Sequence, residues 1–312
     1  MSFEKIYLRD VSKCAHKETG QDVLHVRDPH SLVQAAGYLK YKMALNNELI
    51  FFRGQTNLYG SLSPSLFRKC TTQKTQSGRI NRLQKAIDVI SAKNKIINKL
   101  SNNSKEALLQ HYGLNTSWVD LVDNIWVALW FACHGTLSDG SYGRYVHFER
   151  RSVDRETDKL RREYIERTID QSSGGCDVSP PEAEDITPYA YIILVSVDAK
   201  RETGPDEFVG DITEFVDLRV SCPSIFLRPH AQHGVLFRCR GVGPRRPLDY
   251  IERVKGIIRI SLSDALAWLG SGEALGVRAL FPPPYYDNGY KFLLASECPG
   301  DPQIGSIAHI GT

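Results

Sequence analysis

Residues 189–197 read YAYIILVSV and form the clearest strand signal in the sequence, because β-branched and aromatic residues predominate there. Shorter runs of the same character follow downstream. They predict strands at residues 225–227, 234–239 and 256–260. The second half of the chain is therefore expected to be rich in strands.

The first half is expected to be rich in helices. Asp28 and Pro29 combine a favoured N-cap residue with a proline at the first helical position, and apolar residues follow at steps of three and four. The same periodicity predicts a helix over residues 77–100 and another over 104–113. A highly charged helix is predicted at 150–170.

Between these helices the chain alternates between apolar and turn-like segments. A buried strand is predicted at 49–52 and another strand at 144–148, with a turn at 114–122. Asp123 is expected to cap an almost entirely apolar helix, NIWVALWFACH, which Gly135 closes. A helix-rich first half and a strand-rich second half predict an α+β fold around a central mixed or split sheet.

No linker divides the chain, so a single domain is expected over residues 25–300. Residues 1–24 are expected to form an N-terminal extension with a short strand and a loop, and residues 301–312 a C-terminal tail. Residues 171–188 are rich in Gly, Pro, Ser and acidic residues and predict a mobile loop, either a lid or a surface excursion.

The composition limits the class of protein. Hydrophobic residues make up 42% of the 312 residues and charged residues 24%, as in ordinary globular proteins. No apolar run reaches the ~18 residues of a membrane span, and MSFEKIYLRD does not resemble a signal peptide. The seven cysteines are scattered without a C-x-x-C pair, which argues against a disulfide scaffold and a zinc site. We therefore expect a cytoplasmic protein without a metal; the sequence predicts no oligomeric state.

Positive charge is concentrated in one segment. Residues 68–99 hold nine basic residues and one acidic residue, a formal charge of +8 in a chain whose total is +3. Such a segment is typical of a surface that contacts nucleic acid, for which Arg79, Arg82 and Lys85 are the candidates. The alternative is a solvated helix face.

Three polar stretches adjoin apolar elements. In the first, Arg53, Gly54 and Gln55 end the predicted strand 49–52. A guanidinium binds phosphate or carboxylate in a bidentate manner, and a glycine lets the backbone approach a ligand closely. The alternative is a buried ion pair of Arg53 with Asp120.

The second stretch, QHYGLNT at 110–116, is followed by Trp118 and Asp120. A helix C-terminus favours cations, so His111 is expected to be protonated and to bind an oxyanion, or else to belong to a capping network.

The third stretch, RPHAQHG at 228–234, precedes a predicted strand. Its Gln232 amide can orient a water, a ribose hydroxyl or a base edge. His230 and His233 raise the question of a metal, but no third ligand stands at a readable spacing. We expect these three stretches to meet around one hollow.

Several common signatures are missing from the sequence. It contains no P-loop, no G-x-G-x-x-G after a strand, no G-x-S-x-G and no H-E-x-x-H. This argues against a P-loop NTPase, a Rossmann-type dehydrogenase, a serine hydrolase and a zincin. Cys133 lies in the apolar helix and is interpreted as a packing residue.

The same stretches resemble the FRG domain, a family named after its Phe-Arg-Gly. IFFRGQTNLYGSLSPSLFRK, LLQHYGLNTSWVDLVDNIWVALWFAC, LRPHAQHGVLF and ALFPPPYYDNGY resemble its four ordered motifs over roughly residues 30–292. The main departure is Ser117-Trp118-Val119, where the family usually has Arg-Leu-Leu.

The resemblance implies a function in bacterial defence or toxin action. An Arg on an early strand, a polar middle motif and a late Gln look like the pattern of ADP-ribosyltransferases, which cleave NAD. The resemblance then implies Arg53, His111 and Gln232 as catalytic residues and NAD as the cofactor. Further ligand-binding residues would be Gln55, Tyr112, Thr116, Asp120, Arg228 and His233.

One departure weakens this implication, because the last motif lacks the typical Glu after Gln232; Glu214 and Asp217 are the nearest acids upstream. Two alternatives stay open. One is a non-catalytic module that binds a nucleotide or nucleic acid, and the other is an interaction protein whose buried polar groups only specify the fold.

Overall fold

The structure is a computed structural model that describes residues 11–15, 22–46, 48–70, 72–171, 181–241, 247–296 and 300–311. Within these residues, ten strands form one mixed sheet in the order β1-β2-β12-β7-β3-β4-β11-β10-β9-β8. Neighbouring strands are antiparallel except β12 and β2, which are parallel. The expected α+β class with a large central sheet is confirmed. The strands are β1 (Val11–Ala15), β2 (Asp22–Val26), β3 (Glu48–Gln55), β4 (Val119–Val122), β7 (Tyr189–Asp198), β8 (Arg201–Gly204), β9 (Glu207–Val209), β10 (Thr213–Asp217), β11 (Gly234–Cys239) and β12 (Val254–Ser261).

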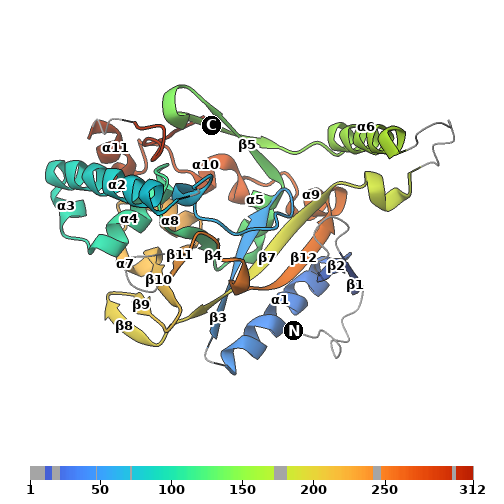
Figure 1. Ribbon diagram of the computed structural model, residues 1–312, viewed down its shortest axis with the longest axis horizontal. Coiled ribbons are helices and arrows are strands. Elements are labelled where there is room, and N and C mark those ends of the chain that lie inside the picture. Colours follow the sequence, from blue (N-terminus) through green and yellow to red (C-terminus); the bar gives the residue numbers. More distant parts are fainter. Residues whose placement is uncertain are drawn as a thin grey trace.

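The sheet is centred on β7, the strand that the sequence signals most clearly. β7 pairs with β3 over eight residues and with β12 on its other side. Its side chains are buried on both faces, which explains why the run is apolar throughout rather than alternating. Figure 1 shows β3, β7 and β12 side by side, with α1 (Pro29–Ala44) across one face.

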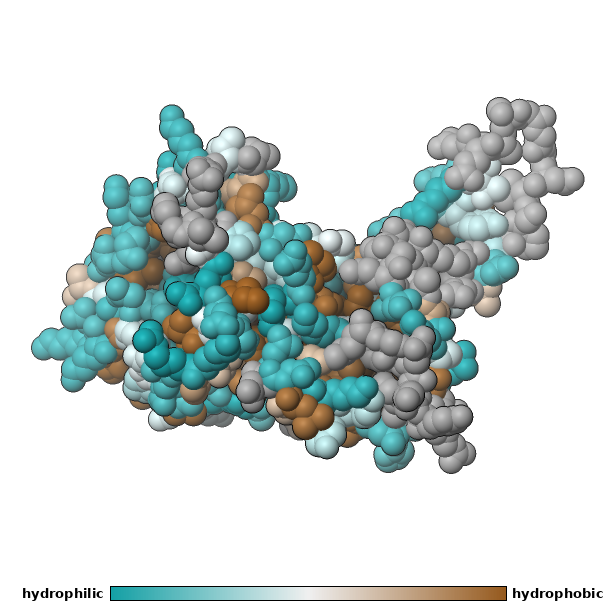
Figure 2. Space-filling view, turned by 60° about the horizontal axis from the view of Figure 1, so that its bottom comes forward, coloured by the Kyte–Doolittle hydropathy of each residue, from teal (hydrophilic) through white to brown (hydrophobic). Residues whose placement is uncertain are grey.

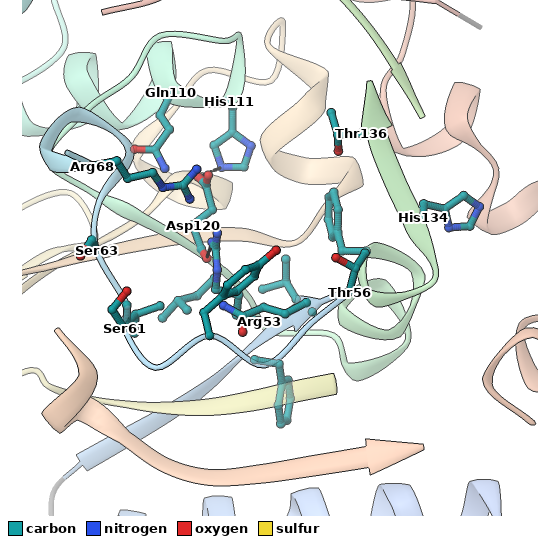
Figure 3. A pocket seen from close by; sticks show the side chains of 18 of the residues that line it. Arg53, Thr56, Ser61, Ser63, Arg68, Gln110, His111, Asp120, His134 and Thr136 are labelled. Atoms are coloured by element: carbon teal, nitrogen blue, oxygen red, sulfur yellow. Dashed lines mark hydrogen bonds and ion pairs between the residues drawn. The ribbon is translucent and has the colours of Figure 1, made fainter. Parts of the chain in front are cut away.

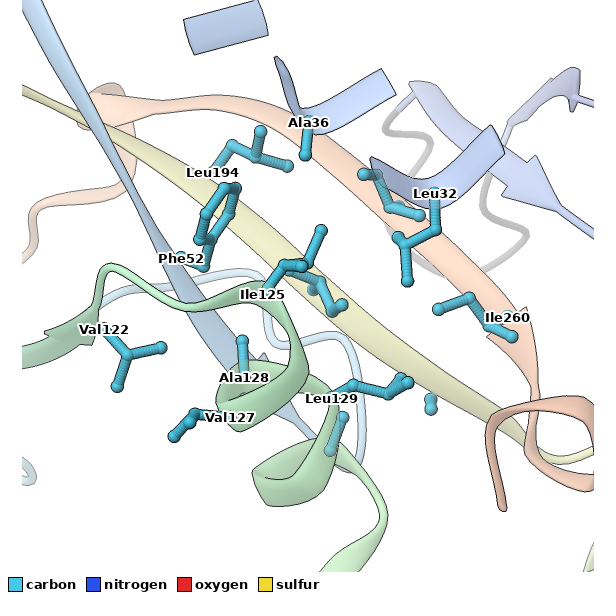
Figure 4. Close-up of a cluster of buried hydrophobic side chains, with 14 of the residues drawn as sticks. Leu32, Ala36, Phe52, Val122, Ile125, Val127, Ala128, Leu129, Leu194 and Ile260 are labelled. Carbon is cyan, nitrogen blue, oxygen red and sulfur yellow. The ribbon is translucent and has the colours of Figure 1, made fainter. Parts of the chain in front are cut away.

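The core on that face joins α1 and α5 (Ile125–Ala132) to the central strands. Leu32 and Ala36 of α1 lie over Leu194 and Ile260, as Figure 4 shows, and Leu129 of α5 belongs to the same cluster. The Asp28 side chain accepts a hydrogen bond from Ser31 N, which confirms the expected N-cap of α1. The opposite face of the sheet is buried by a separate apolar cluster that includes aromatic residues of β3, β10 and β11.

Gly54 sets how closely α5 approaches β3. A Cβ at this position would lie 2.8 Å from both Ala128 C and Ala132 N of the helix. No side chain larger than hydrogen fits this contact. The glycine after Arg53 therefore serves helix packing. It also lines the main cavity, so a close approach to a ligand stays a prediction.

Most of the remaining helices pack together at one end of the sheet, whereas α9 (Leu262–Leu269) and α10 (Val277–Leu280) contribute to the same cluster as α1 and α5. The predicted helix 77–100 is in fact two helices, because Asn94 ends the first and its side chain accepts hydrogen bonds from Ile96 N and Ile97 N of the second. The two helices are α2 (Gln73–Lys93) and α3 (Lys95–Asn98). The other helices at this end are α4 (Asn102–His111), α7 (Leu218–Ser221), α8 (Leu227–Ala231) and α11 (Asn288–Ala295).

Several local predictions were wrong. Residues 119–122 form β4 within the expected turn, because their hydrogen-bond partners come from the distant β3 and β11. Residues 225–227 do not form a strand; Leu227 instead begins the short helix α8. Asn124, not Asp123, caps α5, since Asp123 pairs with Lys40 and Arg219.

A small second sheet lies beside the large one, in the order β13-β6-β5, with β5 (His134–Asp139), β6 (Tyr145–Arg150) and β13 (His309–Gly311). Gly135 belongs to β5 and therefore does not close the preceding helix. Figure 1 shows α6 (Val153–Gln171) projecting beyond the end of β6. Residues 172–180 of the predicted loop lie outside the described residues, and Ala183–Ile186 form a 3₁₀ helix.

Both chain ends contribute to this architecture. β1 and β2 extend the large sheet at one edge, while Ile304, Ile307 and Ala308 are buried and β13 pairs with β6. The domain boundaries at 24 and 300 stay predictions. In the face that Figure 2 shows, apolar residues are scattered over a mainly hydrophilic surface. No helix of the described residues is long and apolar enough to span a membrane.

Candidate functional site

A cavity of about 960 Å³ opens where β3 and β4 end next to α4 and α8. The three polar stretches meet here, as the sequence analysis expects. Arg53 and Gln55 belong to β3, and Asp120 belongs to β4. His111 is the last residue of α4, and Gln232 is the C-cap of α8. Figure 3 shows the side chains of Arg53, His111 and Asp120 converging in this cavity.

Arg53 lies at the base of the cavity with part of its donor capacity unused. Its Nη1 donates a hydrogen bond to the main-chain oxygen of Asp120 at 2.8 Å. Its Nε is buried and has no hydrogen-bond partner among the described residues. Burial lowers the pKa of Arg53, but a guanidinium starts from so high a value that it stays charged. Arg53 can therefore offer a fixed positive charge to an anion.

His111 links two of the other polar groups. Its Nδ1 lies 3.1 Å from Gln232 Oε1, and its Nε2 lies 3.7 Å from Asp120 Oδ1. The side chain is only 3% exposed. Burial lowers the pKa of His111 below its ordinary value, against the opposing effect of Asp120. A neutral ring is therefore favoured over the expected protonated imidazole, because desolvation outweighs the opposing effects of Asp120 and Gln232.

Gln232 uses both ends of its amide within the protein. Its Nε2 donates to Leu280 O at 2.8 Å while its Oε1 contacts His111. The side chain still lines the cavity, but it contacts the imidazole directly. Both ends of the amide thus have protein partners, and its oxygen contacts the His111 imidazole rather than a ligand.

The mouth of the cavity carries cations that sequence reasoning missed as site residues. Arg68 and Lys69 are exposed and line the cavity, and Figure 3 shows Arg68 extending toward Asp120 and His111. Arg79 Nη1 of α2 donates to the main-chain oxygens of Leu66 and Arg68, at 2.7 and 2.8 Å. The signal was present in the basic segment 68–99, but spacing along the chain does not show which cations face a cavity.

The other two nucleic-acid candidates lie on the exposed side of α2. Arg82 pairs with Asp301 at 2.9 Å, and Lys85 is exposed. The three candidates thus have three different environments. Arg79 donates to main-chain oxygens, Arg82 forms an ion pair, and Lys85 is exposed. Of the three, only Lys85 is exposed with neither a hydrogen bond nor an ion pair to the described residues, so contact with nucleic acid stays a prediction.

The far end of the cavity is aromatic. Phe131, Phe148 and Phe281 line it, and the rings of Phe148 and Phe281 stack with centroids 4.3 Å apart. Figure 3 places His134 and Thr136 on this side, away from Arg68 and His111. The cavity therefore combines a basic end with an apolar aromatic end.

Four predicted ligand-binding residues lie behind the cavity wall rather than on it. Tyr112 is fully buried and donates from its hydroxyl to Asp287 Oδ2 at 2.6 Å, and burial raises its pKa. Thr116 donates to Gln110 Oε1. Arg228 is buried against the rings of Tyr112 and Tyr290 and does not line the cavity.

Arg228 nevertheless supports the site, because its Nη1 donates to the main-chain oxygen of His111 at 3.2 Å. His233 adopts a positive φ of 52° at the turn into β11, and its main-chain oxygen accepts from Asp123 N. Across the described residues, no group of three or more His, Cys, Asp or Glu side chains could hold a metal.

The two departures from the FRG pattern have structural consequences that differ. Ser117 donates to Glu106 at 2.7 Å and does not line the cavity, so the residue at this position does not bear on the site. The acids upstream of Gln232 are engaged elsewhere, Glu214 with Arg238 and Asp217 with Arg219. The acid of the cavity is instead Asp120.

Two smaller cavities adjoin the main one. A cavity of about 710 Å³ shares Thr56, Tyr59 and Gly135 with it and extends toward α6. A chamber of about 180 Å³ shares Arg53 and Asp120.

Comparison with known proteins agrees with the first two of the four motifs; the third and fourth lie outside the matched range. The family model of the FRG domain matches residues 48–140, which run from β3 to the end of β5 and its turn. This range includes Arg53, His111 and Asp120. No curated protein and no solved structure matches the chain. Residues 48–140 of the chain therefore contain an FRG domain.

Proposed function

We propose that the cavity binds a nucleotide, with NAD as the expected ligand, and that the protein transfers ADP-ribose from it. One observation carries the proposal. Arg53 Nε, His111 Nε2 and Asp120 Oδ1 are buried polar atoms without a hydrogen-bond partner among the described residues, and their side chains line one cavity. Leaving such atoms unpaired is costly, which favours a ligand that pairs them.

The basic end is suited to the phosphates of a nucleotide. Arg53 supplies a buried guanidinium, and Arg68 and Lys69 add two cations at the mouth. Donors in a fixed fork recognise phosphate oxygens in a bidentate manner. The stacked Phe148 and Phe281 at the opposite end suit a flat heterocycle.

Asp120 is the residue that we assign to the chemical step. When the bond between ribose C1′ and the nicotinamide nitrogen breaks, the electron pair leaves with neutral nicotinamide and positive charge develops on the ribose. A carboxylate in the cavity stabilises that charge. The acceptor then forms a bond to C1′ and loses a proton. Asp120 would thus take the role for which the last motif lacks a Glu.

The first test measures release of nicotinamide from NAD labelled in that group, alone and with RNA, DNA or cell lysate. Release is expected from the wild type and is expected to fall at least 100-fold in Asp120→Asn. Arg53→Gln is expected to lose binding in a thermal-shift assay with NAD. Arg155→Gln, which removes only an exposed pair with Glu149, is the matched control and should behave as the wild type.

A second function is favoured by the exposed cations of α2, of which Lys85 is one. It is a non-catalytic module that binds nucleotide or nucleic acid. A thermal shift with NAD or ATP but no nicotinamide release would select it. Absence of any shift with NAD, ATP or cyclic nucleotides, together with absence of nucleic-acid binding at low salt, would contradict both proposals. Nucleic-acid binding by α2 should be strongest at low salt and weaken in Lys85→Gln.

The proposed reaction also implies a cellular setting. A cytoplasmic effector in bacterial defence, or a toxin, would consume or transfer NAD-derived groups inside the cell. Expression of wild-type protein should then slow growth, and Asp120→Asn should relieve that effect at equal protein level.

A further inference from the structure

The two ring nitrogens of His111 have different surroundings. Nδ1 faces the Gln232 amide at 3.1 Å. Nε2 has no hydrogen-bond partner among the described residues and lies 3.7 Å from Asp120 Oδ1, beyond hydrogen-bond distance. A neutral imidazole carries one proton, so these surroundings decide which nitrogen holds it.

The orientation of the Gln232 amide follows from Leu280. The main-chain oxygen of Leu280 lies 2.8 Å from Gln232 Nε2 and can only accept a hydrogen bond. The amide nitrogen must therefore face Leu280, which turns Oε1 toward His111. An amide oxygen also only accepts, so His111 Nδ1 must donate. The lone pair of the neutral ring is then on Nε2.

Packing holds the ring in this position. Arg228 Nη1 donates to the main-chain oxygen of His111 at 3.2 Å, and Gly234 of β11 lies against the ring. Both His111 and Gln232 are almost fully buried. The ring is thus held by contacts at its backbone, beside Cε1 and at Nδ1, while Nε2 has no hydrogen-bond partner among the described residues.

We propose that Leu280 O and Gln232 hold His111 in the Nδ1–H form, so that Nε2 is a proton acceptor directed at the ligand of the cavity beside Asp120. Gln232 is a positioning residue in this arrangement, since it acts through His111. Asp120 stabilises the imidazolium once Nε2 has taken a proton.

The charges around the ring are consistent with a neutral base. Asp120 of β4 favours the imidazolium and Arg228 of α8 opposes it, while Arg53 of β3 and Arg68 share the cavity. Burial is the largest influence and lowers the pKa of His111. Nε2 is therefore free to accept a proton at neutral pH.

The identity of the proton donor rests on the proposed function. An acceptor hydroxyl or a water placed at Nε2 gives its proton to the ring, and its oxygen electron pair forms the bond to ribose C1′. The C1′–nitrogen bond breaks and its electron pair leaves with nicotinamide. The imidazolium returns the proton to solvent, so the net reaction releases one proton.

The test reads the ring directly, without a substrate. Nitrogen NMR of the protein labelled at histidine, with the His111 signal identified by its loss in His111→Gln, reports which nitrogen is protonated. We expect protonation at Nδ1 and a midpoint below the ordinary ~6.5. In Gln232→Leu the proton should move to Nε2 in a large fraction of molecules. Gln84→Leu, on the exposed face of α2, is the control and should leave the signal unchanged.

A second variant covers the case in which Gln232→Leu does not fold. In Gln232→Glu a carboxylate faces Nδ1, and the midpoint of His111 should rise by about one unit or more. A wild-type signal with the proton on Nε2, or a His111 midpoint that Gln232→Glu leaves in place, would overturn the proposal. If the NMR result holds while no nicotinamide is released, the arrangement stands and the proposed reaction is wrong.

Discussion

Gly234, the first residue of β11, lies directly against the imidazole of His111. A Cβ at position 234 would be 2.7 Å from His111 Nε2 and closer still to Cε1. The glycine in the third polar stretch therefore makes room for the histidine of the second. This contact joins two stretches that are 123 positions apart in the chain.

Gly234→Ala should displace the His111 ring and abolish nucleotide binding. The ring is buried and cannot swing away, so overpacking should also cost about 1–3 kcal/mol of unfolding free energy. Urea unfolding and the NAD thermal shift measure the two effects. Gly78→Ala in α2 is the control, because a Cβ there meets nothing within 4 Å. It should stabilise the protein by up to about 1 kcal/mol and leave binding intact. Unchanged binding in Gly234→Ala would contradict the role of His111.

Tyr112→Phe separates a structural role from a ligand-binding one. The Tyr112 hydroxyl donates to the fully buried carboxylate of Asp287, away from the cavity. Its removal should lower the unfolding free energy by about 1.5–3 kcal/mol, the range for a hydrogen bond to a charged group. The affinity for nucleotide should stay the same, which isothermal titration measures. A loss of affinity without loss of stability would restore the sequence-based interpretation of Tyr112 as a ligand residue.

Arg238→Met tests the buried ion pairs next to β4. Arg238 pairs with Glu106 and Glu214 and stacks on Trp118, with its guanidinium carbon 4.3 Å from the ring centroid. The substitution leaves two carboxylates without their cation and should cost about 3–5 kcal/mol. Arg155→Met is the control, because both its side chain and that of its partner Glu149 are exposed. It should change the unfolding free energy by less than about 0.5 kcal/mol.

Stability should depend on pH through two buried histidines. Burial lowers the pKa of His111 and of His134, so the native state binds fewer protons than the unfolded chain just below pH 6.5 or so. The unfolding free energy should therefore rise with pH through this window. The stability that the neutral histidines contribute should be lost as the pH falls. Urea titrations between about pH 5 and 7.5 should show a smaller slope for His111→Gln than for the wild type. Equal slopes would mean that His111 is not held neutral.

Local signals predicted most elements because they are written in adjacent residues. The run at 189–197 became β7, and Asp28-Pro29 began α1. The strand at 119–122 escaped prediction, since its four residues gain their order from β3 and β11 rather than from their own pattern. Asn94 likewise divides a continuous helical pattern through a side-chain cap.

The candidate site shows the same division. Motif spacing predicted that Arg53, His111 and Gln232 would meet, and they line one cavity. It also predicted Tyr112 and Arg228 as ligand residues, but their side chains face the interior, where one binds Asp287 and the other stacks on aromatic rings. Arg68 was missed, because a cation in a basic segment carries no local sign of the side to which it points.

By itself, the sequence determined the class of fold, the family and the residues that gather at the cavity. These properties follow from hydrophobic periodicity and from motifs read over short stretches. Only the tertiary structure decided which polar groups face the cavity, which form of His111 the Gln232 amide selects, and which acid stands in the cavity. These depend on contacts between residues up to 180 positions or so apart, and a packed interior sets them through distances that no local pattern encodes.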